Sequence, residues 1–493
     1  MNPNAPFLFA VDAGTSSLKT VVYDHAGNVL SSANQRYGYS TPEAGWAEAD
    51  PAAWWQALCA AVPQLHQAGI DLKEIQVVAL TGQMHTAVLL DKNLEPLEPT
   101  LLWLDRRAAR ETVELQEKFK LPPYHLNSTY TLPKLFWLER HRPEVIQKTE
   151  HLLFPKDYLR FCLTGQIMTD YTEAGGAALL DWQSLQWAEE RLEFCGIDPK
   201  ILPPLHTPAD DGGYLLPAIA EQFGLNPNAR VLVGAGDVLA LITGAPPAMN
   251  RLTCSLGSSS MIFCPIQERH KIQDPEDRIY TYPLLPYQLL GGVSSTTGAA
   301  LHWAWQSLYQ QEVSFEEAVS SALEIPAGSG GLFFLPFLSG ERSPYWNDNI
   351  RGSFYGLTLA HSRPHLLRAV MEGVAYSLRY LVEIFKDLDC PIHEIALAGG
   401  GTATEGWPQI ISDVCQLPVA IYAGQETVTH ALYAYACEVM KNEPFEQALL
   451  RTFQPPVQLL HDEQTTHLFD RQYEKYHALA DFSNNVLAES VES

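Results

Sequence analysis

The 493-residue sequence has few basic side chains. Only 32 lysines and arginines stand against 57 aspartates and glutamates, which gives a formal net charge of -25. Nucleic acids and anionic membranes attract basic patches, so this deficit argues against both as partners. Charged residues make up 18% of the chain and hydrophobic residues 46%. That composition excludes a disordered chain and predicts large buried cores.

Cysteine pairs and long apolar runs are missing too. The eight cysteines are scattered, without a CxxC pair or a Cys/His cluster at zinc spacing, which predicts buried, reduced thiols. The N-terminus has neither the basic region nor the apolar region of a signal peptide. No stretch approaches the ~18 apolar residues that a membrane helix needs. We therefore expect a cytoplasmic protein without a membrane partner.

Several widespread catalytic motifs are also absent. The chain has no Walker A sequence, no GxGxxG after a predicted strand, no HExxH and no GxSxG. These absences argue against a P-loop kinase, a Rossmann dehydrogenase, a zinc protease and an α/β-hydrolase.

What the chain contains is an alternation of strands and helices. Apolar runs at 7–11, 20–23 and 75–80 predict strands, and the segment 51–65 predicts a helix that starts at a proline. The C-terminal half repeats this rhythm with predicted elements at 367–378, 392–397 and 407–414. The alternation indicates the α/β fold class.

A strand, a turn of small residues and a second strand occur twice. The two sets span 7–23 and 252–264, and similar hairpins about 240 residues apart predict two similarly built halves. The repeat is too short to decide whether the halves arose by duplication. We place the boundary near 245–248 and expect domains of residues 1–247 and 248–493.

The turn after the first strand has the features of a phosphate-binding loop. Gly14 lets the backbone approach an anion, and the hydroxyls of Thr15 and Ser16 add donors. Asp12 at its start can hold Mg²⁺ through water, and Lys19 lies shortly beyond. An ordinary polar hairpin is the competing interpretation.

Two further loops are rich in glycine or serine. Gly257-Ser258-Ser259 follows an apolar strand, as the first loop does, and Gly400 and Gly401 lie between a predicted strand and a predicted helix. Backbone without side chains can approach a phosphate or a flat ring. A simple strand-to-helix turn is the alternative for the second of these loops.

Asp237 ends an apolar run at 230–236, and this run predicts a strand. A carboxylate at that place can accept a proton from a substrate hydroxyl, and such a base contributes roughly 10²–10⁴-fold in rate. The alternative is a helix N-cap, which is a common use of aspartate.

Polar and aromatic residues also follow the third predicted strand. Met84 and His85 lie in a loop of the kind that carries ligands, although a single histidine is more often structural. Trp103, Asp105 and Arg107 alternate, so that a ring, an acceptor and a donor could face a polyol. A surface strand with salt bridges is the alternative.

In their order and spacing these motifs resemble the FGGY carbohydrate kinases of the actin-like ATPase superfamily. The resemblance extends from Asp12 to about Ala436. The matching segments are 12–19, 82–85, 155–159, 163–165, 169–171, 236–237, 334–344, 368–374 and 399–407.

The resemblance implies an α/β fold of two actin-like (ribonuclease H-like) ATPase domains flanking a cleft. It makes Asp237 the general base, and Asp12 the acid that supports ATP with Mg²⁺, both carboxylates meeting the metal through water. Phosphates would lie on the loops at Gly14 and Gly257, and adenosine beside Gly400 and Gly401. It makes Met84 and His85 contacts of the sugar, beside Asp237. From their alternation we expect Trp103 and Asp105 to contact the sugar as well.

The chain departs from the family pattern at three places. Thr86 stands where xylulose kinases have glycine, and the second loop has Ser258 and Ser260 in place of threonine and glycine. Ser260 is expected to lose the freedom of positive φ, and His430 stands where a glycine lies near the nucleotide. These departures bear on the choice of sugar and on nucleotide affinity.

We expect a kinase that phosphorylates the terminal hydroxyl of a small sugar, D-xylulose first. D-ribulose, another polyol or a sugar acid such as gluconate is the alternative substrate. A non-catalytic actin-like sugar sensor is the alternative of a different class. The expected partners are ATP and the sugar, and a homodimer is the assembly to test.

Overall fold

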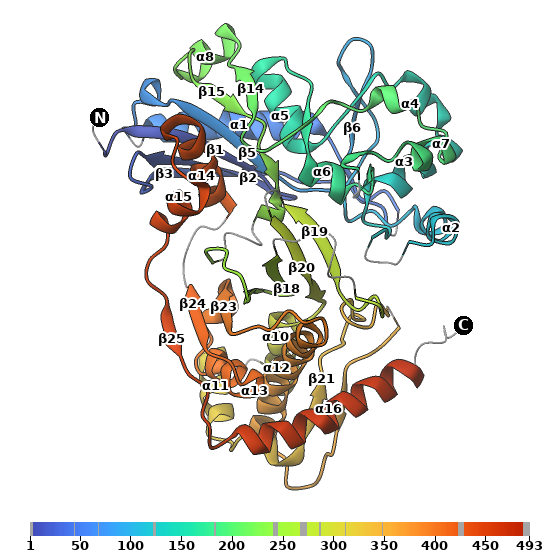
Figure 1. Ribbon diagram of the computed structural model, residues 1–493, viewed down its shortest axis with the longest axis vertical. Helices are drawn as coiled ribbons and strands as arrows, with labels where there is room; N and C mark the ends of the chain where they lie inside the picture. The colour runs from blue at the N-terminus through green and yellow to red at the C-terminus, as the bar shows by residue number, and fades with distance from the viewer. Residues whose placement is uncertain are drawn as a thin grey trace. The chain divides into compact units, whose positions relative to one another are not determined.

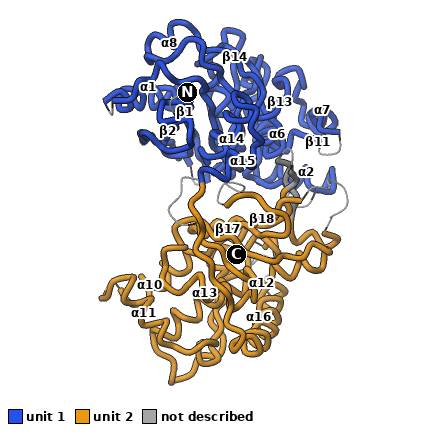
Figure 2. The backbone as a smooth tube through the Cα atoms, turned by 60° about the vertical axis from the view of Figure 1, so that its left-hand side comes forward, with its two compact units in different colours: residues 1–243, 283–286, 426–452 blue, residues 244–282, 287–425, 453–493 orange. Residues whose placement is uncertain are grey.

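The computed structural model describes residues 3–43, 45–67, 69–121, 125–181, 184–239, 245–266, 274–284, 287–310, 312–347, 349–422 and 428–486. The chain forms two compact units (Figure 2). Unit 1 comprises Met1–Thr243, Pro283–Pro286 and Glu426–Thr452, and unit 2 comprises Gly244–Tyr282, Tyr287–Gln425 and Phe453–Ser493. The chain first passes from unit 1 to unit 2 after Thr243, close to the expected boundary at 247. The segment Glu426–Thr452 then belongs to unit 1 again.

Unit 1 is built on a mixed sheet of seven strands with the order β14-β15-β5-β1-β2-β3, and β16 also pairs with β5. Neighbours of β5 run parallel to it, whereas β1, β2 and β3 form an antiparallel meander. The strands are β1 (Pro6–Ala13), β2 (Ser17–Asp24), β3 (Val29–Arg36), β5 (Val77–Gly82), β14 (Asp211–Tyr214), β15 (Arg230–Leu232) and β16 (Ala235–Gly236).

Helices cover this sheet because its central strands are apolar. Every residue of β5 is buried, as expected for a parallel strand with both faces covered. The covering helices are α1 (Pro51–Gln67), α5 (Pro155–Thr164) and α14 (Val428–Lys441). Although α14 comes from the C-terminal part of the chain, it packs on β1 and β5 (Figure 1).

A second core in unit 1 lies beside the main sheet. It gathers leucines and aromatic residues around α3 (Thr131–His141) and includes the residues that follow α6 (Tyr171–Gly176). A small sheet with the order β7-β6-β9 (Pro96–Leu97, Val88–Leu90, His151–Leu153) contributes to it.

Unit 2 carries a sheet with the order β19-β20-β18-β17-β23-β24-β25. Its strands are β17 (Arg251–Leu256), β18 (Ser260–Ile266), β19 (Tyr280–Leu284), β20 (Tyr287–Ser294), β23 (Glu394–Ala398), β24 (Val419–Tyr422) and β25 (Val457–Leu459). The largest core of the protein joins this sheet to α10 (Gly298–Tyr309), α12 (Arg363–Asp387), α13 (Trp407–Cys415) and α16 (Thr466–Val486).

The two sheets share one strand order. In each, an antiparallel meander (β1-β2-β3 or β17-β18-β20) continues through its first strand into parallel neighbours, β5 and β15 or β23 and β24. The expectation of two similarly built halves is therefore confirmed. In the part of the chain that the structure describes, no helix combines the length and apolarity needed to cross a bilayer.

The expected single strand at 230–236 is wrong in one respect. The run is broken between β15 and β16 at Gly234, whose φ is +76°. A Cβ at this position would lie 2.0 Å from the carbonyl oxygen of Leu80, so only glycine fits. An apolar run cannot reveal such a break, because its residues stay buried on both sides of it.

Candidate active site

Three parallel strands of unit 1 end at the same edge of the sheet. Asp12 of β1 is in register with Thr81 of β5, and Gly236 of β16 is in register with Gly82 of β5. The segments that follow these strands therefore emerge together, as polar segments do at the carboxyl edge of a parallel sheet. This register brings Asp12 and Asp237 to one place from positions 225 residues apart.

Asp237 begins a one-turn 3-10 helix, η3 (Asp237–Leu239), directly after β16. Asp237 is an exposed residue of unit 1. Protein atoms around its carboxylate nevertheless displace part of the surrounding water, which disfavours the charged form of the carboxylate. This desolvation, followed by the negative charge of Asp12, raises the pKa of Asp237 to about 7. A carboxylate with a pKa near neutrality is well matched to accepting a proton.

The loop after β1 has a fixed backbone shape. The amide of Gly14 donates to the carbonyl of Ser17 at 3.0 Å, and the amide of Tyr37 donates to the carbonyl of Ser16 at 3.0 Å. The Tyr37 hydroxyl donates to the carbonyl of Gly14. Burial and the charge of Asp12 raise the pKa of Tyr37, so its hydroxyl stays a donor. Lys19 lies on β2, in register with Asp12.

The loop after β5 holds His85 in the left-handed region, with a φ of 61°. Its Nδ1 donates to the carbonyl of Gly176, and the Lys134 ammonium donates to the carbonyl of His85 at 3.1 Å. Burial, together with the charge of Lys134, lowers the pKa of His85 to about 3. The imidazole is therefore neutral at physiological pH. Met84 beside it is buried, whereas His85 is half-buried.

Trp103 connects this loop with the loop after β1. Its backbone amide donates to the Thr86 hydroxyl at 3.2 Å, and its indole N–H donates to the Thr15 hydroxyl at 2.9 Å. Thr86 in turn donates to the carbonyl of Met84 at 3.3 Å. The threonine that replaces the family glycine is thus a link between two loops, and its side chain is fully buried.

Asp105 is fully buried and holds protein groups. Its carboxylate accepts from the amide of Ala47 at 2.6 Å and from the Arg107 guanidinium at 2.8 Å. The guanidinium lies 3.6 Å from the centre of the Trp46 ring and pairs with Glu48 at 2.7 Å. The structure therefore places Asp105 and Arg107 in one buried ion pair. The residues from Trp103 to Arg107 form turns, not a strand.

The two glycine-containing loops of unit 2 lie next to each other. β17 and β23 are parallel, with Ser255 in register with Ala398, so that the loops at Gly257 and Gly400 follow neighbouring strand ends. A Cβ at Gly401 would lie 2.9 Å from the carbonyl oxygen of Leu256, whereas Gly400 faces open space. This open glycine leaves backbone accessible to a ligand.

The loop around Ser258 and Ser259 is supported from α10. Thr297, which precedes that helix, donates its hydroxyl to the carbonyl of Gly257 at 2.9 Å, and its amide donates to the carbonyl of Ser258 at 2.9 Å. The Ser260 hydroxyl lies 2.9 Å from that of Thr297. Ser260 is not among the residues with positive φ. The expected loss of conformational freedom therefore does not arise, because β18 begins with Ser260.

His430 lies on α14 in unit 1 and is buried against Tyr23, with the two ring centres 5.9 Å apart in an edge-to-face contact. The neighbouring Thr429 hydroxyl lies 2.7 Å from the Tyr23 hydroxyl. His430 is thus part of the packing between α14 and β2. Its expected place near the nucleotide stays a prediction.

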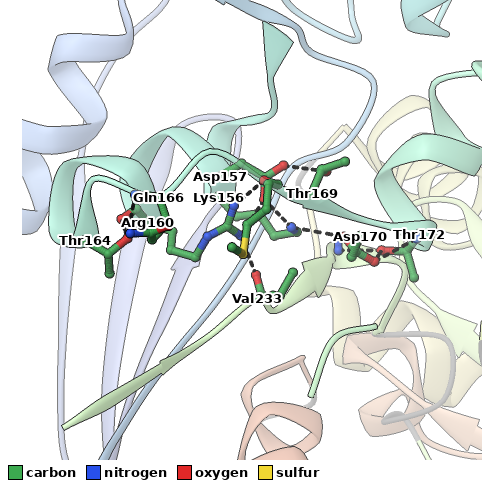
Figure 3. Close-up of polar contacts among 11 residues, drawn as sticks. Lys156, Asp157, Arg160, Thr164, Gln166, Thr169, Asp170, Thr172 and Val233 are labelled. Carbon is green, nitrogen blue, oxygen red and sulfur yellow. Dashed lines mark hydrogen bonds and ion pairs between the residues drawn. The ribbon is translucent and has the colours of Figure 1, made fainter. Parts of the chain in front are cut away.

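The sequence patterns did not predict a network of buried ion pairs in unit 1. Lys156 lies 2.6 Å from Asp157 and 3.0 Å from Asp170, and Arg160 lies 2.8 Å from Asp157 (Figure 3). All four side chains have no exposed surface. Lys156, Asp157 and Asp170 lie in the segments that resemble FGGY kinases, whereas Arg160 follows one of them, and the sequence did not predict that the four side chains meet. The available signal was the run of charges in 156–160 within an otherwise apolar helix.

Glu173 lies beside this network on α6 and is also fully buried. Neither carboxyl oxygen has a hydrogen-bond partner among the residues that the structure describes. Burial raises the pKa of Glu173 well above its ordinary range, opposed by the charge of Lys156. Burial therefore disfavours the charged form of Glu173.

Comparison with known families identifies the chain. The models for the N-terminal and C-terminal domains of the FGGY family of carbohydrate kinases match residues 7–244 and 252–430. The chain belongs to the FGGY family of carbohydrate kinases. The resemblance seen in the sequence is confirmed. This FGGY kinase is an ATP-dependent sugar kinase, which sets aside the alternative of a non-catalytic sensor.

Individual relatives cover most of this FGGY kinase. It is 32% identical over 415 residues to a xylulose kinase of Bacillus subtilis, covering 83% of each chain. It is 28% identical over 439 residues to a gluconokinase of the same organism, covering 85% of each. The crystal structure of ligand-bound xylulose kinase from Lactobacillus acidophilus matches with a TM-score of 0.89 at 26% identity, covering 98% of this chain and 99% of that chain. The expected actin-like α/β fold class is confirmed.

Proposed function

We propose that this FGGY kinase transfers the γ-phosphoryl group of ATP to the terminal hydroxyl of D-xylulose, giving D-xylulose 5-phosphate. The observation that supports the chemistry is the joint position of Asp12 and Asp237 at one sheet edge, with a pKa of about 7 for Asp237. The observation that supports the sugar is the similarity to xylulose kinases, whose names state that substrate.

Asp237 is the general base in this proposal. Its carboxylate takes the proton of the sugar hydroxyl as that oxygen forms a bond to the γ-phosphorus. The bond from the γ-phosphorus to the oxygen that bridges it to the β-phosphate breaks, and ADP leaves. Because phosphoryl transfer depends on positioning and charge stabilisation, the base needs a fixed place more than a high basicity.

Sugar recognition is assigned to the loop after β5 and to Trp103. Because Nδ1 of the neutral His85 donates to the carbonyl of Gly176, its Nε2 is able to accept a hydrogen bond from a sugar hydroxyl. Met84 adds an apolar wall. For Asp105 we propose an indirect role, since its carboxylate already holds Arg107 and the amide of Ala47.

Phosphate binding is assigned to backbone and hydroxyl groups. The loop with Gly14, Thr15 and Ser16 in unit 1 and the loop 257–259 in unit 2 supply such donors, and Lys19 adds a positive charge. The backbone at Gly400 and Gly401 is assigned to adenosine. Backbone N–H groups bind anions without a basic surface, which reconciles ATP with a net charge of -25.

Mg²⁺ fits the donor set of unit 1. Asp12 and Asp237 supply carboxylate oxygens, and no cluster of three His, Cys, Asp or Glu side chains able to hold a metal occurs among the described residues. This set suits an ion that keeps several of its waters and is held by one or two carboxylates with substrate phosphates. Bound there, Mg²⁺ would neutralise charge on the transferring phosphoryl group.

Gluconate is the second candidate sugar, because a gluconokinase is among the relatives that cover most of the chain. Both candidates present a terminal hydroxyl, but only gluconate carries a carboxylate. In this proposal His85 brings a neutral imidazole to the sugar, which favours the uncharged ketopentose. We also propose that the enzyme acts in the cytoplasm as a homodimer, which sedimentation velocity of the full chain tests.

A panel assay tests the substrate. ADP release coupled to NADH oxidation is measured with D-xylulose, D-ribulose, glycerol and D-gluconate at saturating ATP and Mg²⁺. We expect the largest kcat/KM with D-xylulose, by at least about tenfold, since a single well-placed polar contact discriminates by such factors or more. A larger kcat/KM with any other member of the panel overturns the assignment.

A further inference from the structure

The backbone that carries Asp237 is held from two sides by side chains of one buried ion network. Arg160 donates to the carbonyl of Val233 at 2.8 Å. The amide of Gly236 donates to the Thr172 hydroxyl at 2.8 Å. These two bonds enclose the break at Gly234, and the second lies directly before the candidate base.

Charged side chains connect these two hydrogen bonds. Asp157 accepts from Arg160, and Lys156 bridges Asp157 and Asp170 (Figure 3). Asp170 in turn accepts from both the amide and the hydroxyl of Thr172, at 2.7 and 2.5 Å. The chain of contacts therefore runs without interruption from Val233 to Gly236.

The sheet alone gives this segment little support. β16 has two residues, and its one partner among the strands that the structure describes is β5. Gly234 just before it has left-handed backbone and touches the carbonyl of Leu80 closely. A two-residue strand that follows a break needs further contacts to fix its last residue, and Thr172 provides one at its last amide.

Stability alone does not explain the ion network. Two cations and two anions without exposed surface carry a large cost of desolvation, and well-packed apolar side chains are often as stabilising. A hydrogen-bonded ion network instead fixes the orientation of the groups that it binds. Here these groups include the carbonyl of Val233 and the amide of Gly236, which lie shortly before Asp237.

We propose that Thr172, held by Asp170 and Lys156, is a positioning residue for Asp237, and that Arg160 fixes the other end of the same segment. Thr172 acts through the Gly236 amide and does not itself touch the reacting atoms. This inference rests on the proposed role of Asp237 as the base. It adds to that role the residues that set the place of the carboxylate.

The test compares variants of the full-length enzyme in steady-state kinetics with D-xylulose, or with the sugar that the panel identifies. Thr172→Val removes the hydroxyl and keeps the shape, whereas Thr172→Ser keeps the hydroxyl. Thr149→Val is the matched control, because Thr149 is a buried threonine of unit 1 whose hydroxyl donates only to its own helix, at Val145.

We expect Thr172→Val to lower kcat about 10- to 100-fold, the range that a misplacement of about 1 Å can cause. Both KM values should stay within about twofold, and Thr172→Ser should recover most of the activity. Arg160→Lys keeps the positive charge but loses the fork that reaches Asp157 and Val233 together. It should lower kcat as well, and it tests the inference independently if Thr172→Val does not fold.

A double variant separates positioning from general damage. If Thr172 acts only through Asp237, then Thr172→Val added to Asp237→Asn leaves the residual turnover unchanged. The inference is overturned if Thr172→Val lowers kcat by the same factor in the wild-type and in the Asp237→Asn enzyme. It is also overturned if the Thr172→Val enzyme is as active as the Thr149→Val control. If Asp237→Asn itself is nearly as active as wild type, the proposed base is wrong. If it is inactive while Thr172→Val is normal, only the positioning role fails.

Discussion

The indole N–H of Trp103 donates a hydrogen bond to the Thr15 hydroxyl at 2.9 Å. Trp103 is also fixed through its amide to Thr86, next to the loop assigned to the sugar. Thr15 belongs to the loop assigned to phosphate. One side chain therefore ties the two substrate loops of unit 1 to each other, and its removal should affect ATP and sugar differently.

Trp103→Phe keeps the aromatic ring and removes only the N–H donor. We expect the KM for ATP to rise about three- to tenfold, which corresponds to the loss of one hydrogen bond of about 1 kcal/mol. The KM for sugar should change less than twofold, because the ring remains. Thr15→Val also removes a hydroxyl assigned to phosphate, so its effect on the KM for ATP should be at least as large. Adding Trp103→Phe to Thr15→Val should change this KM little further. An unchanged KM for ATP in both single variants would show that the hydrogen bond between Trp103 and Thr15 does not contribute to ATP binding.

The pH dependence of the reaction should report Asp237. Its pKa is raised to about 7 by desolvation and by the charge of Asp12, and a base acts only when ionised. The kcat/KM for sugar should therefore fall about tenfold per pH unit below pH 7 and level off above it. Profiles are measured from pH 5.5 to 8.5 at constant ionic strength. A flat profile across that range contradicts the assigned pKa.

Glu173→Gln should stabilise the enzyme increasingly as the pH rises. In the folded state the pKa of Glu173 lies above its ordinary value of 4.5, so the folded chain retains a proton that the unfolded chain has lost. Wild-type stability then decreases from pH 4.5 up to the raised pKa, by up to about 1.4 kcal/mol per pH unit. Glutamine has no such proton.

The measurement is urea unfolding of both proteins at pH 4.5, 6 and 7.5, with the exposed Glu117→Gln as control. The stability difference between Glu173→Gln and wild type should grow with pH, and that of the control should not. A constant difference would mean that Glu173 ionises normally.

Asp105→Asn should affect stability more than sugar binding. Asp105 and Arg107 have side-chain exposures of 0% and 2%, and breaking such a buried pair costs about 3–5 kcal/mol. Glu48→Gln removes the more exposed partner of the same arginine and should cost less than about 1 kcal/mol. Both are measured by urea unfolding. A stable Asp105→Asn enzyme with a greatly raised KM for sugar would instead place Asp105 in contact with the substrate.

Sequence patterns were sufficient for elements with strong periodicity or clear end signals. The helix expected at 51–65 is α1 (Pro51–Gln67), and the helix at 407–414 is α13 (Trp407–Cys415). The destination of α14 could not be predicted, because an apolar helix fits either sheet equally well. Its position on β1 depends on specific partners such as Tyr23 and Thr429.

The candidate site was predictable where a residue lies at the end of a strand. Asp12, near the end of β1, and Asp237, directly after β16, fall in this class, since parallel strands bring their ends together. Thr172 was not, because its contact with Gly236 joins positions 64 residues apart that share no pattern. Asp105 was assigned to the sugar from alternation alone, and alternation cannot distinguish a side chain that faces a ligand from one that faces Arg107.

Asp237→Asn is the sharpest test of whether Asp237 is the base of this sugar kinase. ADP release is measured at saturating ATP, Mg²⁺ and D-xylulose, with the melting temperature as a control for folding. We expect a folded enzyme whose kcat is lower by about 10²–10⁴-fold, with the KM for ATP nearly unchanged. A folded Asp237→Asn enzyme that turns over within a few-fold of wild type would contradict it.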